Sequence, residues 1–210
     1  MTFLPLCLCV SVVCGGGLRA LQAQQLLDRV VARVGATVIT QTDVDAALVL
    51  GIAEPAPGED RIAGGTRQLI DRQLLLAEVA RFPPAEPSAA DIAAVVARMR
   101  ARAGADFEAV MKRTGRDEQR IRELARDTLR IQAYIDQRFG ATAQASAQET
   151  REYYDTHPQE FRRNGVVPPF EEVELAARES ASAERRRRTV AQWVADLRTR
   201  GEIVELSSRP

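Results

Sequence analysis

The sequence predicts a mainly α-helical protein in which a small antiparallel sheet joins the two ends of the chain. Hydrophobic residues make up 45% of the 210 residues and aromatic residues only 5%, a balance that suits aliphatic helices better than a β-sandwich. Apolar residues recur every three or four positions through most of the chain after residue 40, which is the helical period. Short β-branched runs lie near both ends, and these are the predicted strands.

The first residues are typical of a secretory signal peptide. The apolar run from Phe3 to Cys14 is about 12 residues long, well short of the roughly 20 that a membrane-spanning helix needs. We expect cleavage after Ala23, with Ala20 as the alternative, so that residues 1–23 are removed and residues 24–210 form one domain. Lipid attachment at Cys14 is a second alternative, but the residue before it, Val13, is bulky and branched.

All cysteines of the chain, Cys7, Cys9 and Cys14, lie in this leader. The mature protein is therefore expected to have no disulfide and no cysteine-based metal site. Its stability would have to come from its core alone, and 187 residues are enough for one sizeable core.

A hairpin and a capped helix are predicted at the start of the mature chain. Two β-branched runs meet at Gly35, a residue that can adopt a positive φ. Thr40 stands three residues before Asp43, which is the spacing of a capping box. We expect a helix from about Gln41 to near Ile52.

The middle of the chain reads as a series of helices. They are expected over Glu59 to Arg81, from Ser88 to Gly104, around Phe107 to Gly115, and from Ile121 to Phe139. The first of these is apolar on most sides, so it is the predicted central core helix. Gly64 and Gly65 lie inside it, and each glycine costs roughly 1 kcal/mol relative to alanine. A kink or a late start near Thr66 is therefore expected.

The last third of the chain predicts two helices and a strand. Ser146 and Glu149 have capping-box spacing, so a helix should follow. The prolines and glycine between Thr156 and Pro169 predict a short connector, and a long helix should extend from Phe170 to Gly201. The β-branched run Glu202–Leu206 has no other available strand partner, so we expect it to pair with the opening hairpin.

Four features in this order resemble the chaperone domain of SurA-type periplasmic foldases, over Leu27 to Leu206. They are the hairpin with its capped helix, the Leu69–Leu76 block, the Tyr153–Pro158 phrase with Phe161, and the Pro168–Val173 run. In that family one or two parvulin-type prolyl isomerase domains are usually inserted before the terminal helix. Here the Thr156–Pro169 connector takes that place, so the sequence resembles a helical chaperone core without its isomerase.

The resemblance implies a periplasmic, ATP-independent chaperone that binds unfolded outer-membrane or other exported polypeptides. It implies no cofactor, no stable insertion into the membrane and no enzymatic activity. Two alternatives from other classes stay open: a catalytic peptidyl-prolyl isomerase, and a non-catalytic structural module of an envelope complex. Client identity and oligomeric state do not follow from the sequence.

No catalytic residue and no metal ligand set are predicted. His157 is the only histidine, and with Pro158 beside it a turn residue is the favoured interpretation over a catalytic base. No glycine-rich phosphate loop and no spacing typical of metal ligands occurs in the mature chain.

The Arg185–Arg188 run raises the question of nucleic-acid binding. Against it, Glu184 stands four residues before Arg188, which is a favourable pair spacing on a helix. Basic and acidic residues also balance at 29 each, and no aromatic residue is interleaved for base stacking. We interpret the run as a solvated helix face and expect no nucleic-acid partner.

Met99, Phe107 and Met111 are the candidate peptide-binding residues. Methionine suits promiscuous contacts because its side chain is flexible and polarizable. Their helical spacing favours ordinary core packing as the competing interpretation.

Overall fold

The computed structural model describes residues 28–140 and 144–206. The predicted leader, residues 1–23, and its cleavage site lie outside the described residues. The elements follow the order β1 (Val30–Val34), β2 (Thr37–Thr40), α1 (Gln41–Val49), α2 (Arg61–Arg81), α3 (Ala89–Ala103), α4 (Asp106–Thr114), α5 (Glu118–Phe139), α6 (Ala147–Thr156), the 3-10 turn η1 (Pro158–Phe161), α7 (Phe170–Arg200) and β3 (Ile203–Glu205). The fold is mainly helical, as the sequence predicts.

The three strands form one antiparallel sheet in the order β2-β1-β3. Gly35 makes the hairpin turn with φ +55°, and Val34 of β1 lies opposite both Thr37 and Ile203. The predicted pairing of the two chain ends is thus confirmed. Ile203 packs against the main core, whereas Val204 and Leu206 share an exposed face.

Local capping signals determine where the first helix starts, but tertiary packing determines how the second one runs. The Thr40 hydroxyl accepts from the Asp43 amide at 3.2 Å, and the Asp43 carboxylate accepts from the Thr40 amide at 3.0 Å. The predicted capping box is confirmed. The helix that it starts ends at Val49, earlier than the predicted Ile52.

The helix predicted from about Glu59 to Arg81 extends from Arg61 to Arg81, so its predicted range is confirmed, but the late start near Thr66 is wrong because α2 includes both glycines. A Cβ atom on Gly65 would lie 2.7 Å from Cγ1 of Val44 in α1, and one on Gly64 would lie 2.7 Å from Cβ of Pro55. The glycines therefore allow a close approach that any side chain would prevent. This packing outweighs their low helix propensity.

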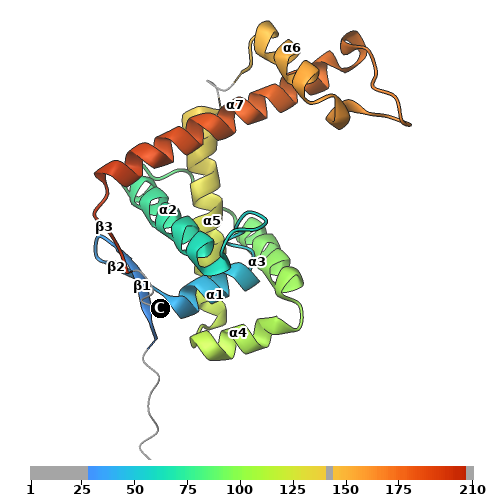
Figure 1. Ribbon diagram of the computed structural model, residues 1–210. Helices are drawn as coiled ribbons and strands as arrows, with labels where there is room; N and C mark the ends of the chain where they lie inside the picture. The colour runs from blue at the N-terminus through green and yellow to red at the C-terminus, as the bar shows by residue number, and fades with distance from the viewer. Residues whose placement is uncertain (1–27, 141–143, 207–210) are drawn as a thin grey trace, which may run out of the picture.

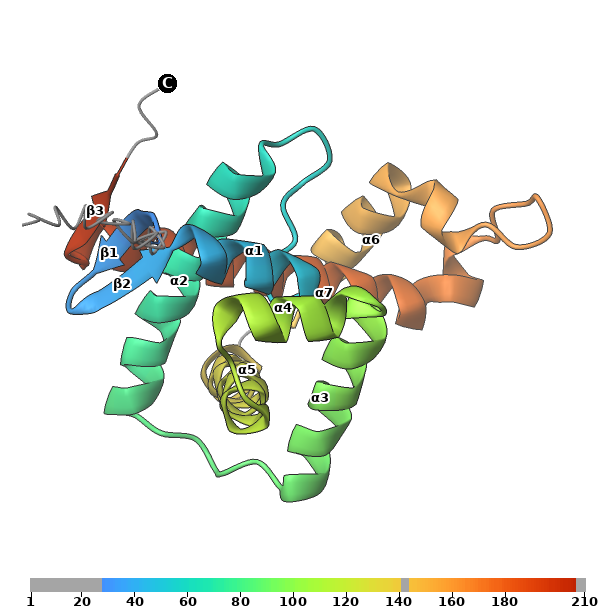
Figure 2. The same ribbon diagram turned by 90° about the horizontal axis from the view of Figure 1, so that it is seen from below.

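Helix α2 is the central core helix, as predicted, and it contacts α1, α5, α7 and two strands. The main core lies where α2 meets the hairpin, the second half of α5 and the second half of α7. A second core lies among α1, α3, α4 and the first half of α5. Figure 2 shows α5 end-on, with α2, α3 and α4 around it. We call the part of the molecule built from helices α1 to α5, the second half of α7 and the sheet the body.

Helix α7 connects the body to a separate projection, which we call the arm (α6, η1 and the first half of α7). With 31 residues at about 1.5 Å per residue, α7 is about 46 Å long. Trp193 and Leu197 in its second half belong to the main core, whereas Val173 and Ala177 in its first half pack against α6 and η1. The arm therefore extends away from the body, as Figure 1 shows.

A candidate peptide-binding surface where the arm leaves the body

The arm begins with a capping box that also holds α7. The Ser146 hydroxyl accepts from the Glu149 amide at 3.2 Å, and the Glu149 carboxylate accepts from the Ser146 amide at 2.8 Å. Arg185 of α7 donates to both Glu149 oxygens, at 2.9 and 2.7 Å. These bonds lower the pKa of Glu149, and the bond from the Ser146 amide has the largest effect. A single carboxylate thus starts α6 and links it to α7.

Aromatic side chains hold the connector between α6 and α7 in place. The Tyr153 hydroxyl donates to Glu160 at 2.9 Å, and the Tyr154 hydroxyl donates to the Pro168 carbonyl at 2.7 Å. Phe161 is buried among these rings. The His157 ring stacks on Tyr153 with centroids 4.2 Å apart. His157 therefore packs at the end of α6, in the connector where the sequence places a turn.

A pocket of about 610 Å³ lies at the root of the arm, which we call the junction pocket. The described residues that line it are Gly140, Gln144, Ala145, Ala147, Leu175, Arg178, Glu179, Ser182, Ala183 and Arg186. They come from the end of α5, the segment that leads into α6, the first residue of α6, and the first half and middle of α7. The pocket is therefore built where the body and the arm meet.

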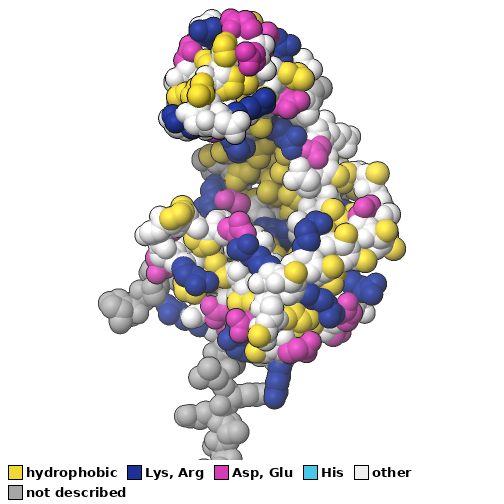
Figure 3. Space-filling model, turned by 90° about the vertical axis from the view of Figure 1, so that its right-hand side faces the viewer, with side chains coloured by type: hydrophobic (Ala, Val, Ile, Leu, Met, Phe, Trp, Pro, Cys, Tyr) yellow, Lys and Arg dark blue, Asp and Glu magenta, His cyan; other side chains and the backbone are white. Residues whose placement is uncertain are grey.

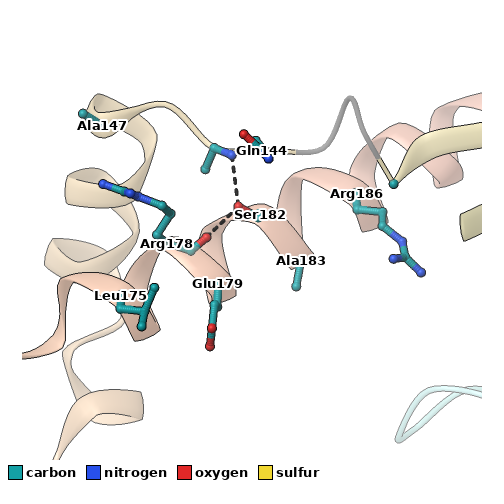
Figure 4. A pocket seen from close by; sticks show the side chains of 10 residues that line it. Gln144, Ala147, Leu175, Arg178, Glu179, Ser182, Ala183 and Arg186 are labelled. Atoms are coloured by element: carbon teal, nitrogen blue, oxygen red, sulfur yellow. Dashed lines mark hydrogen bonds between the residues drawn. The ribbon is translucent and has the colours of Figure 1, made fainter.

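The α7 residues of the junction pocket form one helix face. Leu175, Glu179 and Ala183 are spaced by four and extend to the same side of α7 (Figure 4). Leu175 is 70% exposed, although it is a large apolar residue. Ser182 accepts from the Ala145 amide at 3.0 Å and donates to the Arg178 carbonyl at 2.6 Å, so its hydroxyl is occupied. The face offers apolar surface beside both signs of charge.

The surface is also hollowed between the arm and the body. Figure 3 views the molecule along the arm and shows hydrophobic side chains gathered in this hollow. A concave surface can contact an extended chain from more than one side. It therefore buries more of the surface of that chain than a flat surface does. The junction pocket and the hollow together make this region the candidate site.

The Arg185–Arg188 run is divided among carboxylates from three helices. Arg185 pairs with Glu149 of α6, Arg186 pairs with Asp136 of α5, and both Arg187 and Arg188 pair with Glu184. Exposed pairs of this kind contribute about 0–1 kcal/mol each. The Arg185 and Arg186 pairs link α7 to α6 and α5 at the root of the arm, whereas the Arg187 and Arg188 pairs lie within α7.

The residues that the sequence suggested for peptide binding lie elsewhere. Met99 and Phe107 are buried in the second core of the body, and Met111 packs against that core as a partly buried side chain. The structure brings these three together, but away from the junction pocket. Their role in peptide binding stays a prediction, and the surface described above does not depend on them.

Sequence reasoning missed Leu175, although a signal for it exists. The buried residues Val173, Ala177 and Ala181 follow the helical period along α7. Leu175 stands between Val173 and Ala177, off this stripe, so it must point away from the arm core. The sequence signal for Leu175 is therefore that a large apolar residue lies on the polar side of a charged helix.

The part of the chain that the structure describes contains no cluster of three or more His, Cys, Asp or Glu residues that could hold a metal ion. None of its helices is long and apolar enough to cross a membrane. Comparisons with protein-family models, with curated protein sequences and with solved structures find no match.

Proposed function

We propose that this protein is a periplasmic, ATP-independent chaperone of the SurA-like type, which binds unfolded exported polypeptides at the junction pocket and the adjoining hollow. The observation that carries the proposal is the exposed Leu175 in an open pocket of about 610 Å³, beside Arg178 and Glu179. Unfolded outer-membrane polypeptides are the expected clients, because their extended apolar segments need shelter before insertion.

The composition of the pocket suits clients of varied sequence. Leu175 offers apolar surface to a client side chain, and the neighbouring charges can accept or donate hydrogen bonds to an extended backbone. Full burial of one leucine contributes about 1.5–3 kcal/mol, and ordering an unfolded chain costs free energy. The affinity should therefore be modest. Release then requires no nucleotide and no cofactor.

The connector supports binding without isomerisation. Only residues 157–169 separate α6 from α7, and they form one 3-10 turn and a tight turn closed between Arg163 and Val166. A parvulin-type domain would need on the order of 100 residues at this place. We therefore propose a non-catalytic chaperone, exported through the leader at residues 1–23, with no nucleic acid among its partners.

The proposal is tested by the aggregation of an unfolded outer-membrane barrel, followed by light scattering in the presence of the mature protein. The wild-type protein should suppress aggregation, and Leu175→Glu should suppress it less because a charge would replace the apolar contact. Phe82→Glu is the matched control, because Phe82 is 64% exposed at the end of α2 and does not line the pocket.

Each outcome of this assay has a defined meaning. Equal loss of activity in both variants would assign the effect to general surface hydrophobicity and reject the site. If the wild-type protein fails to suppress aggregation, the chaperone proposal is rejected. Rapid cis/trans exchange of a proline peptide at substoichiometric protein would then favour the isomerase, and stable co-purification with one folded partner would favour the structural module.

A further inference from the structure

A second cavity, of about 110 Å³, lies on the body between β2, α1, α2 and α5. Thr37, Val38 and Ile39 of β2 all line it. Because side chains alternate along a strand, three consecutive lining residues mean that the edge of the strand itself borders the cavity. β2 is an outer strand in the order β2-β1-β3, so its outward N–H and C=O groups have no strand partner in the described sheet.

The charges around this cavity are unbalanced. Arg116 pairs with Asp43 at one side, and Arg120 pairs with Glu123 at 2.9 Å. Arg72 donates one hydrogen bond, to the Leu124 carbonyl at 3.0 Å, and forms no ion pair with the described residues. The arginines at the cavity therefore leave one cation without a bound carboxylate.

Arg72 is an unusual residue to leave without a counter-ion. Burial lowers the pKa of its guanidinium, and the more distant carboxylate of Asp127 only partly opposes this effect. A partly buried cation loses hydration that an ion pair would replace. A guanidinium also presents several N–H groups in a plane that matches a carboxylate. The residue is thus suited to an anionic group that enters from outside.

We propose that this cavity binds the C-terminal residue of an extended polypeptide. The terminal carboxylate would pair with Arg72, the last peptide groups would bond to the free edge of β2, and the last side chain would pack against Leu69 and Leu124. A cavity of roughly 150 Å³ holds benzene, so this smaller one fits one small aliphatic side chain. The Asp43 charge does not oppose the ligand, because Arg116 neutralises it.

The proposal concerns a second site and rests on the proposed function only in that the ligand is a polypeptide. Its test is isothermal titration of the full mature protein with a six-residue peptide that ends in valine, as the free acid and as the C-terminal amide. We expect the acid to bind at least tenfold more tightly than the amide. Equal affinity of the two peptides, or no binding of either, would overturn the proposal whatever the aggregation assay shows.

Variants assign the effect to Arg72. Arg72→Met should remove the difference between acid and amide, whereas Arg113→Met, at an exposed arginine of α4, should preserve it. An unchanged difference in Arg72→Met, with its helical circular dichroism intact, would contradict the assignment. Isobutyrate alone is the last probe: weak binding supports recognition of a polypeptide end, and binding as tight as that of the peptide would reject it in favour of a small free acid.

Discussion

The body and the arm are held together by different means, although α7 runs through both. Among the described residues, the main core of the body contains 15 buried residues, and its second core contains eight. In the same part of the chain the buried residues of the arm core are Tyr153, Phe161, Val173, Ala177 and Ala181. Because apolar burial supplies most of the stability of a fold, the arm has much less of its own.

The arm compensates with local polar contacts. Its α6 has ten residues, which is shorter than an isolated helix needs to be stable in water. The Arg185 to Glu149 pair holds it against α7, the capping box at Ser146 closes its first turn, and the tyrosine hydroxyl bonds tie it to η1 and the connector. The comparison teaches that one continuous helix can join a large core to a small one, and we expect the arm to open at a lower free energy than the body. The peptide-binding surface proposed above would benefit from such a segment.

The largest expected effect comes from breaking the anchor of α7 in the body. Trp193 packs on Tyr134 and Phe139, with ring centroids 5.9 and 5.3 Å away. Trp193→Ala should cost about 3–5 kcal/mol and lower the Tm of the whole protein by about 2–4 °C per kcal/mol. Thermal unfolding followed by circular dichroism measures it, with the exposed neighbour Gln192→Ala as the control. A Tm equal to that of the control would contradict the anchoring role.

A matching change in the arm should have a local effect instead. Phe161→Ala removes a buried ring of the arm core, at a cost of about 3–5 kcal/mol to the arm itself. Amide hydrogen exchange should become faster in α6 (residues 147–156) and stay unchanged in α2 (residues 61–81). Gln159→Ala, at an exposed position nearby, is the control. Equal loss of protection in both helices would show that arm and body unfold together.

The smallest effect concerns the carboxylate that caps α6. The folded-state pKa of Glu149 lies below its usual 4.5, so its contribution to stability is present above about pH 4.5 and is lost as the pH falls through the folded value. Glu149→Gln should therefore speed exchange in α6, relative to α2 at the same pH, and the difference from wild type should be smaller at pH 3 than at pH 6. Glu152→Gln in the same helix should have little effect at either pH. A difference for Glu149→Gln that is as large at pH 3 as at pH 6 would contradict this assignment.

Local signals in the sequence predict local structure well. The capping pairs at Thr40 and Ser146 locate the starts of α1 and α6, because both partners lie within one helical turn. The return of β3 to the hairpin follows by elimination, since a strand needs a partner. The predicted late start of α2 near Thr66 is wrong for a tertiary reason. Gly64 and Gly65 lie inside the helix because α1 and the loop before α2 pack too closely there for a side chain, and only the tertiary structure reveals this packing.

The candidate sites depend even more on tertiary structure. Leu175 lines a pocket only because α5 ends and α6 begins beside α7. Arg72 looks like any other polar position of a helix until α5 packs against it and leaves it with one carbonyl partner. Met99 and Phe107 are predicted peptide-binding residues because of their residue type, yet their positions on α3 and α4 place them in a core. Spacing can indicate that a residue such as Leu175 is exposed, but residue type and spacing do not show which other helices surround it.

The most direct test of the account places a photo-reactive amino acid at position 175 of the mature protein and, in a second variant, at position 82. Each variant is mixed with an unfolded outer-membrane barrel, irradiated and analysed by mass spectrometry for crosslinked client. The account predicts abundant crosslinks from position 175 and few from position 82, because only the first lies in the junction pocket. Equal crosslinking from both positions, or none from position 175 while aggregation is still suppressed, would contradict it.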